Sequence, residues 1–224
     1  MKPWLARGMT QESTLANLRP VGDPDLQRGR RRTVFRSNTG DVDPGAYPST
    51  VAHVVDLRRQ DEIDVLPHPL RDRAGYRAVP FFDPAQSVEG PTDLELEGQY
   101  DDWIDRHRRT IALVFHALAE TDGDVVVCCS AGKDRTGVVS ALLARLWGAD
   151  LDVIGVDYAR TGPALADRFR RELAESDDLA YTRRMHRCVP ETAQHLVREV
   201  ERRFGSVAGY LRSLGLADAE IARL

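Results

Sequence analysis

The chain has 224 residues, 42% of them hydrophobic, which is enough for a sizeable core in one domain or in one domain with a helical appendage. The net charge of −4 excludes a general affinity for nucleic acid or for anionic membranes. Three cysteines make no disulfide framework, and six scattered histidines lack metal-ligand spacing. We therefore expect no metal and no other cofactor.

The first residues lack the apolar stretch of a secretory signal, and no run approaches the ~18 apolar residues of a membrane span. Together with the cysteine content, this predicts a soluble protein of a reducing compartment, the cytoplasm, with no integral membrane association. Export without such a signal stays open. The sequence carries no signal for an oligomeric state.

Composition predicts an N-terminal arm over residues 1–14 and a single domain over residues 15–224, with a short helix near Ser13–Leu18. Short apolar or β-branched runs predict the strands. These lie at Thr33–Arg36, Val51–Leu57, Tyr76–Phe82 and Asp124–Cys129.

Helical spacing of apolar residues predicts one long amphipathic helix over Gln99–Ala119. Further helices are expected at Thr136–Trp147, Leu151–Ala159, Ala164–Ala174, Glu191–Phe204 and Ser206–Leu214, with a last turn at Ala217–Leu224. Strands come early and helices late, joined by strand–loop–helix crossovers. This order is typical of an α/β fold with a central, mostly parallel sheet flanked by helices and a helical C-terminal part.

The segment from Cys129 to Arg135 places five residues between a cysteine that ends a predicted strand and an arginine that opens a predicted helix. Successive backbone N–H groups in such a turn can form an anion-binding nest, and the helix N-terminus adds its dipole. Arg135 can place two donors on phosphate oxygens, which lysine cannot reproduce. The candidate phosphate-binding residues are Ser130, Ala131, Gly132, Lys133, Asp134 and Arg135.

The same field favours the thiolate of Cys129 at neutral pH. A thiolate in line with phosphorus would form a phosphocysteine, which water later hydrolyses. Thr136 can donate its hydroxyl to the sulfur and stabilise it as the leaving group of the second step. The plainer interpretation makes Cys129 a core cysteine and Arg135 a helix cap, but the position between an apolar strand and an apolar helix favours catalysis.

The loop CCSAGKDRTG resembles the phosphate-binding loop of the protein-tyrosine and dual-specificity phosphatase superfamily, most closely the bacterial branch that includes the mycobacterial secreted tyrosine phosphatase B. Weaker motifs extend the resemblance over most of the chain, from about Leu15 onward. They are Asn17-Leu18-Arg19, Val34-Phe35-Arg36-Ser37-Asn38, Val55-Asp56-Leu57-Arg58 with Glu62, Asp157-Tyr158, and the tail from Phe204-Gly205-Ser206 to Leu214-Gly215-Leu216.

The resemblance implies a cysteine-phosphatase-like fold and a phosphoprotein or phosphoinositide substrate. In relatives, basic residues in the loop accompany activity on phosphoinositides, and Lys133 is such a residue here. We therefore expect hydrolysis of phosphate monoesters with phosphotyrosine preferred, and with phosphoserine, phosphothreonine and phosphoinositides as further candidate substrates.

Two positions depart from the family pattern. The residue before the nucleophile is usually histidine, which is understood to brace the loop, and here it is Cys128. The early Asn-x-Arg-Asp-x-Gly-Gly motif is eroded to Asn17-Leu18-Arg19-Pro20-Val21-Gly22-Asp23. Simple packing of Cys128 is the favoured interpretation over redox control of Cys129.

Protonation of the leaving oxygen requires a carboxylic acid near the loop. Asp83 is the first candidate, because it ends a predicted strand and related enzymes have an acid in a similar Pro-Phe context; Asp134, inside the loop, is the second. Asp56, Arg58 and Glu62 are expected to brace the sheet and the loop through ion pairs, and Arg36 and Ser37 are placed with them. Packing is the expected role of Asp157 and Tyr158.

Two alternative functions remain open at this point. The lost histidine allows a catalytically weak phosphate-binding module, a pseudophosphatase. The Cys128–Cys129 pair allows a thiol redox or sulfur-transfer enzyme, although Arg135 and Thr136 have no part in simple thiol exchange.

Overall fold

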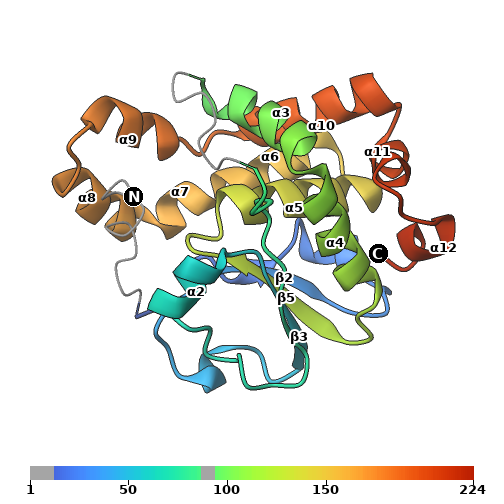
Figure 1. The fold of residues 1–224 in the computed structure, drawn as a ribbon, viewed down its shortest axis with the longest axis horizontal. Coiled ribbons are helices and arrows are strands. Elements are labelled where there is room, and N and C mark those ends of the chain that lie inside the picture. Colours follow the sequence, from blue (N-terminus) through green and yellow to red (C-terminus); the bar gives the residue numbers. More distant parts are fainter. Residues whose placement is uncertain (1–12, 87–93) are drawn as a thin grey trace.

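The computed structural model describes residues 13–86 and 94–224. They form a mixed α/β fold around a five-stranded sheet with strand order β1-β2-β5-β3-β4. β1 pairs antiparallel with β2, and the other three pairings are parallel, which confirms the predicted mostly parallel sheet (Figure 1). The strands are β1 (Arg19–Pro20), β2 (Val34–Asn38), β3 (Val51–Asp56), β4 (Tyr76–Ala78) and β5 (Asp124–Cys129).

Helices surround the sheet, and the chain after β5 is helical, as predicted. Figure 1 shows α4, α5, α6 and α10 together on one side of the sheet. The helices are α2 (Gln60–Val65), α3 (Leu96–Arg106), α4 (Arg108–Ala119), α5 (Asp134–Leu146), α6 (Leu151–Ala159), α7 (Thr161–Ala164), α8 (Ala166–Ala174), α9 (Leu179–Met185), α10 (Pro190–Phe204), α11 (Val207–Ser213) and α12 (Asp218–Ile221), with 3₁₀ turns at Pro24–Gln27 and Pro44–Ala46. In residues 13–86 and 94–224, no helix has both the length and the apolarity needed to cross a membrane.

β5 is the central strand, because β2 and β3 pair with its two edges, and Val125–Cys129 are buried. Its side chains alternate between two cores. Val125, Val127 and Cys129 belong to the large core beneath the helices, whereas Val126 and Cys128 belong to a smaller cluster on the opposite face. Strand periodicity therefore separates the two adjacent cysteines and points Cys129 to the helical side.

The prediction of one continuous helix over Gln99–Ala119 is wrong, because the chain breaks at His107 into α3 and α4. His107 leaves helical geometry, with φ −107° and ψ 26°. Its buried ring accepts a hydrogen bond from the backbone N–H of Asp83 through Nδ1, at 3.1 Å. The apolar spacing continues through the break, so the sequence pattern alone does not reveal it.

The structure differs from the predicted elements at three further places. No helix forms at Ser13–Leu18, where the chain makes a turn and Asn17 bonds to distant residues. β4 ends at Ala78 instead of Phe82, although the backbone N–H groups of Val79 and Phe81 still donate to the carbonyls of Asp56 and Leu57. The predicted helix Ala164–Ala174 is divided at the buried Leu165 into α7 and α8.

Candidate active site

The loop Ser130–Lys133 connects β5 to α5, so Cys129 ends the central strand and Arg135 lies in the first turn of a 13-residue helix. Gly132 turns the loop with φ +66°. A Cβ atom there would lie 2.5 Å from the carbonyl carbon and oxygen of Ser37. Only glycine accommodates both this conformation and this contact, so the predicted loop glycine has a steric reason.

The second half of the loop is held by Asn17 and Arg36. The Asn17 side-chain amide donates to the carbonyl oxygens of Ala131, at 3.1 Å, and Gly132, at 2.8 Å. Arg36 Nη2 donates to the Gly132 oxygen as well, at 2.9 Å. Both carbonyls are thus turned toward the protein and away from the interior of the loop.

The first half of the loop is held by Thr39 and Arg168. The Thr39 N–H donates to the carbonyl oxygens of Cys129 and Ser130, at 3.0 and 3.2 Å. Arg168, from α8, donates to the Ser130 oxygen through Nη1, at 3.2 Å, and to the Ser130 hydroxyl through Nη2, at 3.1 Å. Four successive carbonyls, from Cys129 to Gly132, are therefore bound on the outer side of the loop.

Because these carbonyls point outward, the backbone N–H groups between them point toward the interior of the loop. Among the hydrogen bonds formed by residues 13–86 and 94–224, none has the backbone N–H of Ala131, Gly132 or Lys133 as donor. Buried backbone amides need a partner, and a group of them around one point is an anion-binding nest. The geometry of the loop suits a bound oxyanion next to Cys129.

Arg135 is held in a fixed orientation by Glu62 of α2. The two side chains form a bidentate pair, Nη1–Oε2 at 2.6 Å and Nη2–Oε1 at 2.8 Å, and both are about nine-tenths buried. Although burial opposes ionisation, Arg135 lowers the pKa of Glu62 to about 2. The Phe82 ring lies 5.4 Å from the guanidinium carbon. The predicted bracing role of Glu62 corresponds to a direct contact with the candidate phosphate-binding arginine.

Asp56 and Arg58 form a second, fully buried ion pair at 2.7 Å. Tyr76 also donates to Asp56, at 3.1 Å, and Arg58 reaches the carbonyl of Leu66. This pair braces the end of β3, as predicted.

Cys128 lies on the same face of the sheet as this pair, packed with Tyr47, Val54 and Leu70. Burial, followed by the charge of Asp56, raises the pKa of its thiol well above the usual value. Because Cys128 and Cys129 point to opposite faces of a paired strand, a disulfide between them would require the strand to be rebuilt. The arrangement agrees with a packing role for Cys128 and does not favour the redox alternative.

Asp83 forms hydrogen bonds with Ala85, His107 and Arg109, outside the loop. Arg109 binds its carboxylate with two bonds, Nε–Oδ2 at 2.9 Å and Nη2–Oδ1 at 2.7 Å, and the Ala85 N–H donates to it as well. The hydrogen bond from Arg109 is the main cause that lowers the pKa of Asp83 to about 2. A group held as a carboxylate in this way is a poor proton donor at neutral pH.

Asp134 begins α5, at the mouth of the loop, and its side chain is 29% exposed. Its Oδ1 accepts hydrogen bonds from Tyr100 Oη and from Lys133 Nζ, both at 2.6 Å. Lys133 is 2% exposed, with its ammonium 5.7 Å from the centre of the Tyr158 ring. The lysine therefore adds positive charge beneath the loop and does not extend into solvent.

Thr136 is completely buried in the first turn of α5. Its hydroxyl has no hydrogen-bond partner among the described residues. A buried hydroxyl without an acceptor is uncommon. It is available to a charged sulfur or to a phosphate oxygen.

Sequence reasoning missed several residues of the surrounding layer. Asp157 was assigned to packing, but it pairs with Arg36, at 2.7 Å, and with Arg19, at 2.9 Å. Arg168 lies in a basic run of a kind typical of a solvated surface, yet it is 6% exposed and bonded to Ser130. The signal for Asp157 was its place in a family-like motif, whereas no local pattern identifies Arg168.

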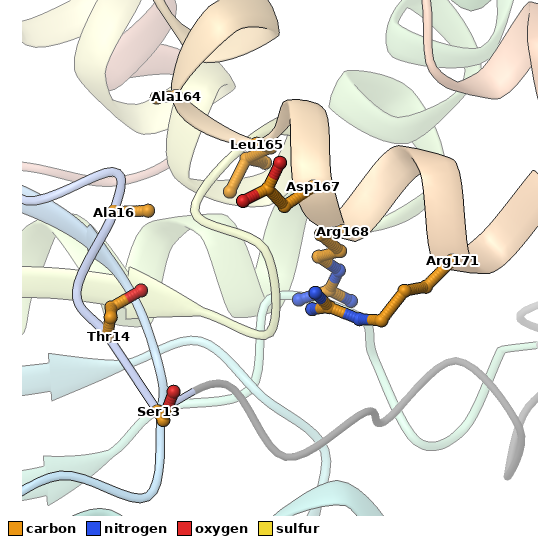
Figure 2. A pocket seen from close by; sticks show the side chains of 8 residues that line it. All are labelled: Ser13, Thr14, Ala16, Ala164, Leu165, Asp167, Arg168 and Arg171. Atoms are coloured by element: carbon orange, nitrogen blue, oxygen red, sulfur yellow. The ribbon is translucent and has the colours of Figure 1, made fainter.

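A pocket of about 390 Å³ lies on the outer side of the loop, between residues 13–16 and α8. Figure 2 shows Arg168 and Arg171 extending from α8 beside it, with Ser13 and Thr14 opposite. None of the residues from Cys129 to Arg135 lines this pocket.

Comparison with known proteins shows similarity to two bacterial phosphatases. The sequence is 29% identical over 232 aligned residues to "Triple specificity protein phosphatase PtpB" of Mycobacterium tuberculosis, covering 93% of this chain and 83% of that protein. It is 26% identical over 194 residues to "Tyrosine-protein phosphatase" of Nostoc commune, covering 76% of this chain and 63% of that protein. The family model described as "Tyrosine phosphatase family" matches residues 11–224, and the chain therefore belongs to the tyrosine phosphatase family.

Proposed function

We propose that this phosphatase hydrolyses phosphate monoesters through a phosphocysteine intermediate on Cys129. The observation that carries the proposal is the outward binding of four successive loop carbonyls, from Cys129 to Gly132. This arrangement presents the loop amides to a phosphate in front of the thiolate. Arg135, held by Glu62, adds a planar charged donor for the phosphate oxygens.

In the first step, the Cys129 sulfur forms a bond to phosphorus as the bond from phosphorus to the leaving oxygen breaks. A carboxylic acid transfers its proton to that oxygen. In the second step, a water oxygen bonds to phosphorus, the carboxylate takes a proton from this water, and the sulfur–phosphorus bond breaks. The Thr136 hydroxyl, buried and without an acceptor among the described residues, suits a donor to the departing sulfur.

Asp134 is the proposed acid, in place of the first candidate from the sequence. Asp134 lies at the loop with a partly exposed carboxyl, whereas both oxygens of Asp83 are bonded to Arg109. Asp83 then has a positioning role near Phe82, whose ring contacts Arg135.

Substrates that differ only in their leaving group test this assignment. Asp134→Asn is expected to lower kcat on phenyl phosphate by about 10²–10³-fold, because a phenolate leaves poorly without a proton. The same variant should lose far less on 4-nitrophenyl phosphate, whose leaving group is stable as an anion. Asp83→Asn serves as the matched control and should affect both substrates alike. Selective loss in Asp83→Asn with none in Asp134→Asn would reverse the assignment.

Phosphotyrosine is the proposed preferred substrate, with phosphoserine, phosphothreonine and phosphoinositides as further candidates. The family and the name of the mycobacterial relative support this scope. Steady-state kcat/KM on phosphotyrosine, phosphoserine and phosphothreonine peptides of one sequence, and on soluble phosphoinositides, measures the preference. We expect the phosphotyrosine peptide to have the highest value. Negligible turnover of that peptide would reject the preference.

The proposed catalytic domain is residues 15–224, with residues 1–14 as an arm. The family match over residues 11–224 includes the whole of this domain and supports its extent.

The proposed location of the protein is the cytoplasm. The described cysteines Cys128, Cys129 and Cys188 are all free thiols, as a thiolate nucleophile in a reducing compartment would require.

A further inference from the structure

A buried pair of tyrosines supports the Asp134 carboxyl. Tyr100, from α3, donates to Asp134 Oδ1 at 2.6 Å, and the hydroxyls of Tyr100 and Tyr158 are 2.8 Å apart. Both tyrosines are 1% exposed, and Tyr158 belongs to α6. Two helices distant in sequence thus contribute hydroxyls to one hydrogen-bonded chain that ends at the loop aspartate.

Which hydroxyl donates in each of these two hydrogen bonds follows from the single hydrogen that each tyrosine hydroxyl carries. Burial raises the pKa of Tyr100 well above its usual value and that of Tyr158 to about 12, so both hydroxyls keep their hydrogens at working pH. Tyr100 has one hydrogen, and Asp134 Oδ1 can only accept it. Tyr158 must therefore donate to Tyr100, which orients the Tyr100 hydroxyl toward Asp134.

Both donors to Asp134 bind the same oxygen. Lys133 Nζ and Tyr100 Oη each lie 2.6 Å from Oδ1, and no described residue forms a hydrogen bond with Oδ2. When this carboxyl is protonated, its two donors on Oδ1 leave Oδ2 as the oxygen that carries the proton. Tyr100 and Lys133 thereby leave Oδ2 as the oxygen from which a proton can be transferred.

We infer that Tyr100, oriented by Tyr158, is a positioning residue for proton transfer: it fixes Asp134 through Oδ1 and assigns the transferable proton to Oδ2. The inference rests on the proposed role of Asp134 as the acid. As the proton moves from Oδ2 to the leaving oxygen, negative charge develops on the carboxylate. The donors already bonded to Oδ1 stabilise that charge without rearrangement.

Tyr100→Phe removes the donor and keeps the buried ring. We expect kcat on phenyl phosphate to fall about 10-fold, the size expected for one lost hydrogen bond to a charged group. On 4-nitrophenyl phosphate kcat should change less than about 2-fold, with KM unchanged for both substrates.

Tyr210→Phe is the matched control. Tyr210 is also fully buried and donates to a backbone carbonyl, that of Ile104 at 2.9 Å, away from Asp134. It should lower thermal stability by an amount similar to Tyr100→Phe and leave the ratio of the two kcat values unchanged. An equal change of that ratio in both variants would assign the effect to folding and overturn the inference.

The double variant Tyr100→Phe/Asp134→Asn separates the two claims. If Tyr100 acts through Asp134, the double variant has the same kcat on phenyl phosphate as Asp134→Asn alone. Additive losses would overturn the role of Tyr100 and leave that of Asp134 intact. If Asp134→Asn shows no selective loss on phenyl phosphate, the proposed acid fails, whatever Tyr100→Phe does.

Discussion

Replacing Cys129 with serine is expected to abolish turnover of aryl phosphates, with kcat lower by about 10⁴-fold or more. The serine hydroxyl is a far weaker nucleophile than a thiolate unless a base takes its proton. Phosphate binding should persist, because the loop amides and Arg135 remain. Rapid-quench trapping of phosphate on the wild-type protein, with the modified residue found by peptide mass, should identify Cys129 as the carrier.

Cys128→Ala is the control for this experiment. Cys128 is buried on the opposite face of the sheet, so the variant should lose about 1 kcal/mol of stability by cavity formation and retain turnover. A thiol redox enzyme would instead lose its activity in both variants. A pseudophosphatase would bind phosphate without turnover even as wild type, and equal rates for wild type and Cys129→Ser would contradict the phosphocysteine mechanism.

Glu62→Gln is expected to have the largest effect among the residues that do not touch the reacting atoms. Removal of one partner of a buried ion pair leaves an uncompensated charge, at a cost of about 3 kcal/mol. Arg135 also loses the bidentate contact that fixes its plane, and we expect kcat/KM to fall about 10²-fold because misplacement of a binding group has effects of that size. Urea unfolding and steady-state kinetics measure the two effects.

The stability effect of Glu62 has a defined pH range. Its folded pKa of about 2 lies below the unfolded value of about 4.3, so its contribution is complete above about pH 5 and is lost as the pH falls toward 2. The unfolding free energies of wild type and Glu62→Gln should converge over that interval. Glu199→Gln, which removes a surface pair with Arg202, is the control and should lower the unfolding free energy far less than Glu62→Gln. Equal losses in both variants would contradict a special role for Glu62.

Local sequence was enough to locate the loop and its strand–loop–helix context. A continuous apolar run predicted β5, and the structure has it with the same bounds, Asp124–Cys129. The apolar helix after Arg135 was also predicted, although α5 begins two residues earlier, at Asp134. Such features are set by neighbouring residues, through burial periodicity and backbone preference.

The sequence was a poorer guide to where a helix breaks and to which role a residue has. The break at His107 depends on a contact with Asp83, 24 positions earlier, and the apolar pattern passes through it unchanged. α2 was missed because its six residues carry little helical periodicity, yet it delivers Glu62 to Arg135. Short elements stabilised by one tertiary contact leave a weak local signal.

The choice between Asp83 and Asp134 as the acid also could not be made from the sequence, because it depends on which groups lie near each carboxyl in space. Both are aspartates in suitable contexts in the sequence. Arg109 forms hydrogen bonds with both carboxylate oxygens of Asp83. Tyr100 and Lys133, in contrast, both bind the same oxygen of Asp134. Proton affinity depends on these neighbours in space, and Tyr100 is 34 residues from the carboxyl it binds.

The sequence alone predicted the loop from Cys129 to Arg135 and the chemistry that it suggests. The spacing of these residues, the position of the glycine and the alternation along the strand are local properties of the chain. The direction of the loop carbonyls is not. It depends on Asn17, Arg36 and Arg168, between 38 and 115 positions away from the carbonyls they bind. Only the folded chain brings these donors together, since hydrogen bonds form by distance in space, and so only the tertiary structure decided which side of the loop faces a phosphate.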